Sequence, residues 1–297
     1  MLSQVRDLDL QLLRLFVCVV ENGGFSAAQG ELGIGQSTIS TQMAKLETRL
    51  GFRLCERGKA GFRLTPKGEQ VLAATRKLFA AIDTFKGEAQ GMADKLLGSL
   101  SIGLSESLDD DVLARVGVAI GAFRQRNQDV HIDLLSAMPA ELERRLLQDQ
   151  LHLAIGYFSG VQTALNYQLL FEEQQALFCG RDHPLFGRTE LDGELLQQQD
   201  GVHHPYRFIG ADEPWQAVAS SARSEQVEGT LAFILSGAHI GYLPRHIAAP
   251  WKARGLLRAL LPEVYGFTVQ FHLASHRGRQ PSEAQQAFVT DLLAAFA

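Results

Sequence analysis

The sequence predicts an α/β protein with a small helical domain, one long helix and a larger domain of alternating strands and helices. Three observations support this prediction. Apolar residues recur at helical spacing near the N-terminus, a heptad pattern runs from Val71 to Leu96, and short apolar strands alternate with helices beyond Gly98. The 297 residues are enough for two or three domains.

The composition excludes several other classes of protein. Hydrophobic residues make up 46% and charged residues 21%, which is typical of a globular chain rather than a disordered or fibrous one. The cysteines Cys18, Cys55 and Cys179 lie too far apart for a disulfide framework or a zinc finger. Arg14 interrupts the apolar stretch that ends at Val20, and no cleavage site follows it. We therefore expect a cytoplasmic protein with reduced, inert thiols.

The net charge of −5 conceals an uneven distribution. Between Gln36 and Lys67 the chain has seven basic residues and only two acidic ones, Glu47 and Glu56. This basic island therefore carries a charge of +5, and the rest of the chain carries −10. Such an island is a typical electrostatic footprint for phosphate. Charge alone does not distinguish it from a solvated face with chance clustering.

The local pattern around the island predicts a helix-turn-helix. After a first amphipathic helix, Gly23-Gly24 forms a turn, and Ser26 with Gln29 fits a capping box that opens a second short helix. That helix ends at Gly33, and a third begins near Gly35-Gln36. The apolar face of the third helix consists of Ile39, Met43, Leu46 and Leu50.

Small polar residues on the third helix and a following hairpin are the candidate DNA contacts. Residues 53–65 predict a wing with Gly58 and Gly61 at its tip and with Phe62 and Leu64 pointing inward. Base edges would be read by Gln36, Thr38 and Thr41. Phosphates would be bound by Lys45, Arg53, Arg57, Lys59 and Arg63. The full predicted interface is Ser26, Gln36, Ser37, Thr38, Ser40, Thr41, Lys45, Arg53, Arg57, Lys59 and Arg63.

Five motifs in this region together resemble the winged helix-turn-helix of LysR-type transcriptional regulators. They are Leu13-Arg14-x-Phe16, Gly24-Phe25-Ser26-x-Ala28, Gln36-Ser37-x-x-Ser40, Leu46-Glu47-x-x-Leu50-Gly51 and Leu64-Thr65-Pro66-x-Gly68. The resemblance implies a sequence-specific DNA-binding transcription regulator. Two residues depart from the family pattern, since Cys55 replaces a usual Phe and Gly30 replaces a better helix former. Neither departure removes an expected DNA contact.

The predicted long helix carries apolar or small residues in alternating steps of four and three. They are Val71, Thr75, Leu78, Ile82, Phe85, Ala89, Met92 and Leu96. Strict alternation favours a seam between two helices over an amphipathic helix packed on its own domain. The resemblance implies the same, because LysR-type regulators pair through a linker helix. We expect Val71, Leu78, Ile82, Phe85 and Met92 to join two chains as a homodimer or homotetramer on a two-fold-related DNA site, and Gly98 to end the helix.

The remaining chain predicts two α/β lobes. Strands at 100–104, 130–135 and 153–155 alternate with helices, which indicates parallel sheet, and a similar pattern recurs from 169 to 260. A strand at 269–274 and a helix from Pro281 to Phe296 close the chain. This region resembles the family's effector domain, which is related to periplasmic binding proteins. His152 replaces the Asp of one family motif.

The expected domains are 1–66 for DNA binding, 67–97 for the linker helix and 98–297 for effector binding. Within the last domain, lobe I comprises about 98–165 and 268–297, and lobe II about 166–267.

Ligands of open α/β sheets bind beyond the carboxyl ends of the strands. This rule selects Ser105, Glu106, Ser107, Met138, His203, His204 and Arg207 as effector-binding residues. Family effectors are commonly small organic acids or aromatics held by a hydroxyl at the position of Met138. Because Met138 lacks that donor and Glu106 and Asp109-Asp110-Asp111 add negative charge, we expect a neutral or amine-bearing effector. The Asp run alternatively serves to charge a helix N-terminus, its more ordinary use.

Three classes of function remain, and a ligand-responsive transcription regulator is preferred. Its expected partners are double-stranded DNA, a small-molecule effector, further copies of the chain and RNA polymerase, with no membrane. A binding module without a DNA role would need no basic island or wing. An enzyme would need an acid/base pair, and the chain has no phosphate loop, nucleophile elbow or His-Glu-x-x-His motif. His203-His204 lacks further metal ligands, so we expect neither a metal nor a cofactor.

Overall fold

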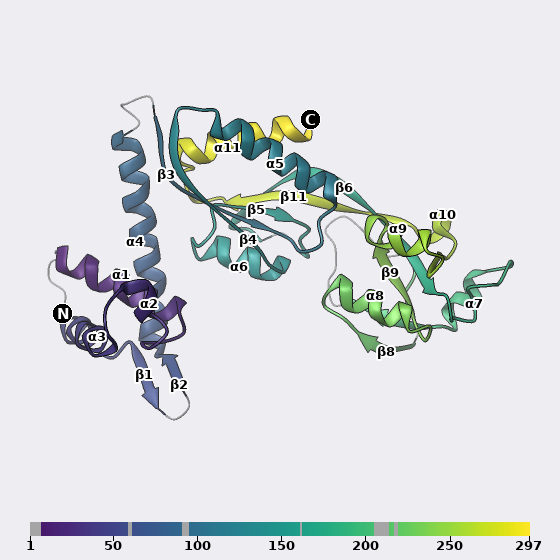
Figure 1. Cartoon of the computed structure of the whole chain (residues 1–297), viewed down its shortest axis with the longest axis horizontal. Helices are drawn as coiled ribbons and strands as arrows, with labels where there is room; N and C mark the ends of the chain where they lie inside the picture. The colour runs from purple at the N-terminus through teal and green to yellow at the C-terminus, as the bar shows by residue number, and fades with distance from the viewer. Residues whose placement is uncertain (1–6, 59–60, 91–94, 161, 205–213, 217–218) are drawn as a thin grey trace. The chain divides into compact units, whose positions relative to one another are not determined.

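The computed structural model describes residues 7–58, 61–90, 95–160, 162–204, 214–216 and 219–297 (Figure 1). The chain divides into two compact units, Met1–Phe85 and Lys86–Ala297, which are treated separately below. Within the described residues, no helix is both long enough and apolar enough to cross a membrane.

The N-terminal unit contains the expected helices and hairpin. Its elements are α1 (Asp7–Glu21), α2 (Gln29–Leu32), α3 (Gln36–Leu50), β1 (Cys55–Gly58), β2 (Gly61–Leu64) and the start of α4 (Pro66–Gln90). The predicted apolar face of α3 is confirmed at Ile39, Met43 and Leu46, which are fully buried, whereas Leu50 is half-buried. These side chains pack against Phe16 of α1 in one hydrophobic core.

The second helix begins later than the capping-box motif predicted. Residues 25–28 form turns, and α2 starts at Gln29 without a side-chain cap. The Gln29 side chain instead donates Nε2–H to the Ser26 carbonyl at 3.1 Å and accepts the Gln36 N–H at Oε1 at 3.2 Å. Gln29 therefore caps the third helix rather than its own. The predicted stop at Gly33 is confirmed, with φ of +63° and its N–H donated to the Gln29 carbonyl.

The long helix ends earlier than the heptad pattern predicted. α4 ends at Gln90, and β3 (Leu96–Leu104) already pairs with β4 (Gln128–Ser136) from Leu96 onward. Gly98, expected to end the helix, lies inside β3 opposite Val130 and has a φ of +105°. Strand pairing with a distant segment thus outweighs the helical period at this end. Met92 lies outside the described residues.

The first turns of α4 pack on their own unit. Thr75 is 3% exposed, and Val71 and Leu78 lie partly buried against the same core as Phe16. Phe85, near the other end, is 68% exposed. The start of α4 therefore fits the alternative of a helix packed on its own domain, and an exposed large apolar side chain appears only further along.

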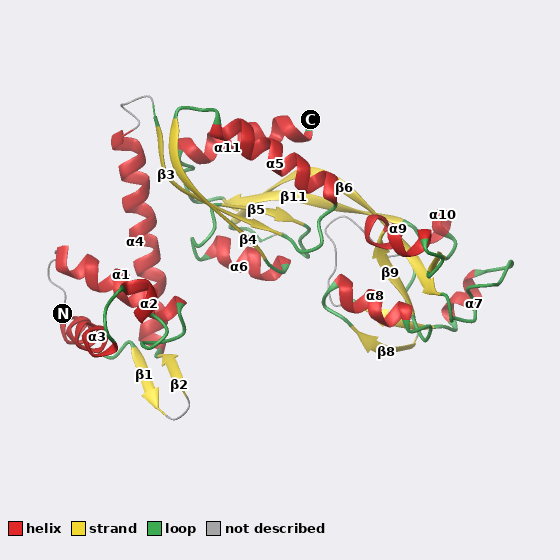
Figure 2. Cartoon of the chain, viewed as in Figure 1, coloured by secondary structure: helices red, strands yellow, loops and turns green. Residues whose placement is uncertain are grey.

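The C-terminal unit is built on one mixed sheet. Its further strands are β5 (Leu153–Gly156), β6 (Leu165–Gly180), β7 (Asp200–His203), β8 (Ala219–Arg223), β9 (Ile240–Pro244), β10 (Leu257–Ala259) and β11 (Phe267–His276). Its helices are α5 (Asp110–Arg124), α6 (Pro139–Leu147), α7 (Gly193–Gln197), α8 (Val227–Leu235), α9 (Arg245–Ala253), α10 (Pro262–Tyr265) and α11 (Glu283–Phe296). In lobe I, helices lie on both faces of the sheet (Figure 2).

The sequence predicted parallel sheet, but the sheet of the C-terminal unit is only partly parallel. Parallel pairing joins β3 to β4 and β5 in lobe I, and β7 to β8 and β9 in lobe II. The long strands β6 and β11 pair antiparallel and run through both lobes side by side (Figure 1). The chain leaves lobe I along β6 and returns along β11, so these two crossings must run in opposite directions.

His152, at the family's Asp position, serves the fold of lobe I. Its Nδ1 accepts the Ser101 N–H at 2.8 Å beside the strand pair β3 and β5. Burial, followed by the positive charge of Arg279, lowers the pKa of His152 to about 4, so its ring is a neutral acceptor at physiological pH.

Candidate nucleic-acid interface and effector cavity

The first turn of α3 presents polar side chains to solvent. Gln36, Ser37, Thr38 and Thr41 are exposed, and Ser40 is half-buried. Thr41 Oγ1 donates to the Ser37 carbonyl at 2.9 Å, which fixes that hydroxyl along the helix. Because the opposite face is buried, this turn is free to enter a groove. Ser26 is also exposed, in the turn before α2.

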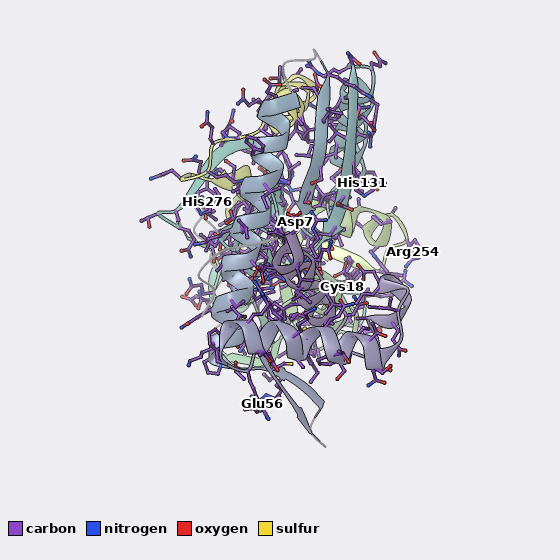
Figure 3. All side chains as sticks on the ribbon, turned by 90° about the vertical axis from the view of Figure 1, so that its left-hand side faces the viewer. Asp7, Cys18, Glu56, His131, Arg254 and His276 are labelled. Atoms are coloured by element: carbon purple, nitrogen blue, oxygen red, sulfur yellow. The ribbon has the colours of Figure 1, made fainter. Side chains whose placement is uncertain are left out.

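The hairpin is held against the turn that precedes α2. β1 and β2 pair antiparallel with Glu56 opposite Arg63, and both side chains are exposed (Figure 3 labels Glu56). The rings of Phe25 and Phe62 meet edge to face, with centroids 5.8 Å apart. At Gly24, a Cβ would lie 3.3 Å from Phe62 Cβ, so the motif around Gly24 positions the wing.

The basic residues of the wing are partly described. Arg53 and Arg63 are exposed, as is Lys45 on α3. Arg57 lies on β1, where its backbone pairs with Phe62, and Lys59 lies outside the described residues. The described cations therefore face solvent, as phosphate contacts require.

Three residues hold the base of the wing, namely Glu47, Thr65 and Gly68. The sequence had indicated them only through their charge or through the family resemblance. Glu47 Oε1 accepts the Leu54 N–H at 2.7 Å. Thr65 Oγ1 donates to the Arg53 carbonyl at 2.9 Å and accepts the Gly68 N–H at 2.9 Å, which caps α4. A Cβ on Gly68 would lie 2.0 Å from the Leu54 carbonyl oxygen, so this position needs glycine.

One member of the basic island has a structural partner. The guanidinium of Arg49 on α3 binds both carboxylate oxygens of Asp9 on α1, with Nη2 to Oδ2 at 2.7 Å. The Asp9 side chain is 1% exposed and that of Arg49 is 30% exposed. The pair ties the first helix to the recognition helix and removes Arg49 from the charges available to DNA.

The C-terminal unit contains a small cavity of about 50 Å³ between its two lobes, which is partly open to solvent. It is lined from the strand ends of both lobes, from the first turns of α8 and from the crossing strands β6 and β11. The lining residues are Glu106, Ser107, Tyr157, Glu173, Gln175, Val202, His204, Val227, Thr230, Tyr242, Pro244, Phe267 and Phe271.

Three of the predicted effector residues line this cavity, namely Glu106, Ser107 and His204. Ser105 is 2% exposed and lies beneath the surface, packed near Gly156. Met138 is the N-cap of α6, where its carbonyl accepts the Leu142 N–H at 3.0 Å, and it is absent from the described lining. His203 is exposed beside the cavity rather than in its lining. Arg207 lies outside the described residues.

The strand-end rule missed the residues that the crossing strands contribute. Glu173 and Gln175 come from the middle of β6, and Phe267 and Phe271 from β11. No described strand ends at Glu173, so nothing in the rule could select it. The one available signal was the polar run Glu172-Glu173-Gln174-Gln175, which lies between the apolar runs at 169–171 and 176–179.

Hydrogen bonds join the loop after β3 to two helices of the other lobe. Ser107 Oγ donates to Glu228 Oε1 at 2.6 Å, and Gln226 Nε2 donates to Glu106 Oε2 at 3.3 Å. His246 Nε2 lies 3.1 Å from the Ser107 carbonyl oxygen. Ser107 has a φ of +57°, a strained value for a residue with a Cβ. These contacts make the loop a contact point between the lobes beside the cavity.

Glu173 is the most perturbed acid of the cavity. Its side chain is 10% exposed, and its Oε1 accepts the Gln175 Nε2–H at 2.7 Å. Burial, followed by the nearby negative charge of Asp109, raises the pKa of Glu173 to about 8. His246 Nδ1 lies 3.5 Å from Glu173 Oε2 and 3.6 Å from Asp109 Oδ2.

The cysteines and the histidines form no further reactive site in the described residues. All three cysteines are buried and unbridged, and burial raises the pKa of Cys18 and that of Cys179, the latter to about 11. Among the residues described, no group of three His, Cys, Asp or Glu side chains is arranged to hold a metal ion.

Comparison with known proteins identifies the family. Residues 10–69 match the family model described as bacterial regulatory helix-turn-helix protein, lysR family, and residues 93–297 match the LysR substrate binding domain. The chain is 38% identical to the HTH-type transcriptional activator BauR of Pseudomonas aeruginosa, over 97% of this chain and 95% of that protein.

Solved structures share the fold of the whole chain. A full-length OxyR variant from Pseudomonas aeruginosa is 19% identical, with a TM-score of 0.68, and the match covers 99% of this chain and 95% of that one. Full-length CbnR in complex with its target DNA is also 19% identical, with a TM-score of 0.59 and coverages of 96% and 99%. The chain therefore belongs to the LysR family and is a DNA-binding transcription regulator that responds to a small-molecule effector.

Proposed function

We propose that the regulator reads its promoter site with the first turn of α3 and clamps the DNA backbone with its wing. Gln36, Thr38 and Thr41 would contact base edges in the major groove, with Ser26, Ser37 and Ser40 close to phosphates. The single observation that carries this proposal is the exposed polar turn of α3 backed by a fully buried apolar face. CbnR, a protein of the same fold, has a structure in complex with target DNA, which supports the assignment.

Phosphate contacts supply most of the sequence-independent affinity in this scheme. Lys45, Arg53, Arg57, Lys59 and Arg63 would each neutralise a phosphate and release condensed counterions. Asp9 holds Arg49 in the protein, so Arg49 contributes no such contact. A DNA partner also places the protein in the cytoplasm.

Two chains pair through the far part of α4 in this proposal. The exposed Phe85 supports a seam that begins beyond the turns packed on the N-terminal unit, with Ile82 and Met92 as further members. Val71 and Leu78 contribute to the fold of each chain as well. A homodimer, or a homotetramer of two such pairs, presents two recognition helices to a two-fold-related site and contacts RNA polymerase.

The effector occupies the cavity between the lobes and is bound by Glu106, Ser107, His204 and the crossing strands. Ser105, Met138 and His203, which are not in the described cavity lining, and Arg207, outside the described residues, stay predicted effector-binding residues. The contacts of Ser107 with Glu228 and His246 lie beside the cavity, so a bound effector alters how the lobes meet. That change would shift the arrangement of the paired chains and the bending of the bound DNA.

In this proposal the chain consists of a DNA-binding domain at 1–66, a linker helix at 67–97 and an effector-binding domain at 98–297.

Footprinting on the DNA upstream of the gene tests this function. We expect protection of a two-fold-related site at low salt, and absence of protection contradicts the regulator's proposed reading surface. In a salt titration, Arg53→Ala should reduce the slope of log affinity against log salt by about one unit without changing sequence preference. Lys252→Ala, which removes an exposed lysine of α9, is the matched control and should leave the slope unchanged. A change of preference at one base pair would show that Arg53 contacts a base instead.

A further inference from the structure

The charged side chains that line the described part of the cavity are acidic. Glu106 and Glu173 are in the lining, and no Lys or Arg is among the described lining residues. Glu228 adds a third carboxylate beside Ser107, and Asp109 lies 3.6 Å from His246 behind the cavity wall. The cavity therefore has a negative potential that favours a cation.

Among the described residues, Glu173 forms no ion pair with Lys or Arg, and the basic group within ion-pair distance of it, His246, also lies beside Asp109. The hydrogen-bond donor to Glu173 is the neutral amide of Gln175. His246 Nδ1 lies 3.5 Å from Glu173 Oε2 and 3.6 Å from Asp109 Oδ2, so two carboxyl groups share one imidazole. Burial, followed by the negative charge of Asp109, raises the pKa of Glu173. A ligand cation at this position would oppose that rise.

Four aromatic side chains also line the cavity, namely Tyr157, Tyr242, Phe267 and Phe271. Tyr242 and Phe267 meet edge to face with centroids 4.9 Å apart and planes at 87°, and Tyr157 meets Phe271 at 5.5 Å and 71°. Both pairs therefore place aromatic rings in the cavity wall together with Glu106 and Glu173. Aromatic faces beside carboxylates form the usual environment for ammonium groups in proteins.

We infer that the effector is a small amine whose ammonium group binds Glu173, in the field of Glu106, and whose apolar body packs on Tyr157, Tyr242 and Phe267. This inference rests on the proposed function, in which the effector occupies this cavity. It sharpens the expectation of a neutral or amine-bearing effector by naming a carboxylate that the strand-end rule could not select. An anionic effector would instead face two carboxylates in a desolvated space, which opposes binding.

Binding of matched small molecules to the full-length protein tests the inference. The probes are butylamine and 2-phenylethylamine, each compared with the alcohol and the carboxylic acid of similar size, in calorimetric titrations near pH 8.5. Both amines should bind at least about tenfold more tightly than their alcohols and acids, the range expected of charge-assisted hydrogen bonds. An acid that binds as tightly as its amine, or no binding of either amine at millimolar concentration, overturns the inference.

Two substitutions locate the ammonium group. Glu173→Gln keeps the shape of the side chain and removes its charge, and should weaken amine binding about tenfold or more. Glu172→Gln, at the adjacent exposed position on β6, is the matched control and should change binding by less than about twofold. Glu106→Gln should give an intermediate loss. Equal affinities in the Glu173→Gln variant and the unchanged protein would overturn the role of Glu173.

Footprinting with the same protein preparations separates this inference from the proposed function. DNA protection with no response to any amine contradicts the amine effector alone. Loss of protection in every preparation contradicts the DNA-reading proposal instead. Protection that persists in Glu173→Gln while its amine response is lost supports both.

Discussion

The two units each bury a carboxylate and satisfy it differently. In the N-terminal unit, Asp9 is 1% exposed and is bound by both arms of the Arg49 guanidinium. In the effector domain, Glu173 is 10% exposed and receives a hydrogen bond from the neutral amide of Gln175. A buried carboxylate with a permanent cation stabilises a fold. A buried carboxyl group without a permanent cation is costly to ionise, which is why we assign Glu173 to ligand binding and Asp9 to the fold.

The surfaces that the two units offer to partners differ in the same way. The proposed DNA contacts come from one continuous stretch at 26–63, and the cations among them whose exposure is described, Lys45, Arg53 and Arg63, are exposed to solvent. The cavity residues come from several strands, helices and loops and are partly buried, acidic and aromatic. A polymer of phosphates is bound by solvated cations at little desolvation cost, whereas a small ligand must be bound by groups already removed from water.

Removal of the Arg49 guanidinium is the strongest test of this comparison between Asp9 and Glu173. Arg49→Ala leaves Asp9 buried without a cation, so the free energy of unfolding should fall by about 3 kcal/mol. Arg53→Ala, four positions along the chain and exposed, should change it by less than about 0.5 kcal/mol while weakening DNA binding. Chemical denaturation of the full chain measures both variants. Equal losses would show that Asp9 does not depend on Arg49.

The pH dependence of amine binding tests the proposed role of the Glu173 carboxylate. An ammonium group favours ionised Glu173, whose pKa is about 8 in the free protein, so binding must displace a proton below that pH. Affinity for butylamine should therefore rise about tenfold per pH unit from about pH 6 to 8 and level off above it. The charged and titratable groups around Glu173 are Glu106, Asp109, Asp111, Arg115, Glu172, His204, Arg245 and His246. A flat profile would contradict proton displacement on binding, and a profile unchanged by Glu173→Gln would assign the displaced proton to one of these other groups.

The same residue should cost stability when no amine is bound. The folded-state pKa of about 8 exceeds the ordinary value of 4.5, so the contribution of Glu173 to stability is lost as pH rises between these values. Glu173→Gln should therefore stabilise the free protein by roughly 4 kcal/mol near pH 8.5 and have little effect near pH 4.5. Thermal denaturation at the two pH values measures the difference, with Glu172→Gln as control. Equal stabilisation at both would point to packing instead of charge.

The smallest expected effect concerns the thiols. Burial raises the pKa of Cys18 and Cys179, the latter to about 11, so neither is a thiolate at neutral pH. Mild peroxide should leave both unmodified by intact mass, and the variant Cys179→Ser should retain DNA binding. Rapid oxidation of Cys179 would show that the effector domain opens around its core.

Local pattern predicted the architecture of the N-terminal unit well and that of the cavity only in part. The buried face of α3 and the stop at Gly33 follow from helical period and glycine geometry, which operate over a few residues. The late start of α2 did not follow, because the Gln29 side chain bonds the Ser26 carbonyl and the Gln36 N–H instead of forming a capping box. In the cavity, Glu106, Ser107 and His204 follow strand ends, whereas Glu173 lies in mid-strand.

The sequence by itself determined the helix-turn-helix, the wing, the alternation of strands and helices, the basic island and the family resemblance. Each of these depends on residue type and spacing within a short window. The tertiary structure alone decided that Arg49 belongs to Asp9, that β6 and β11 cross between the lobes in opposite directions, and that Glu173 lies in the cavity wall. These features join residues far apart in the chain, so their charges and their burial are set by partners that no local pattern specifies.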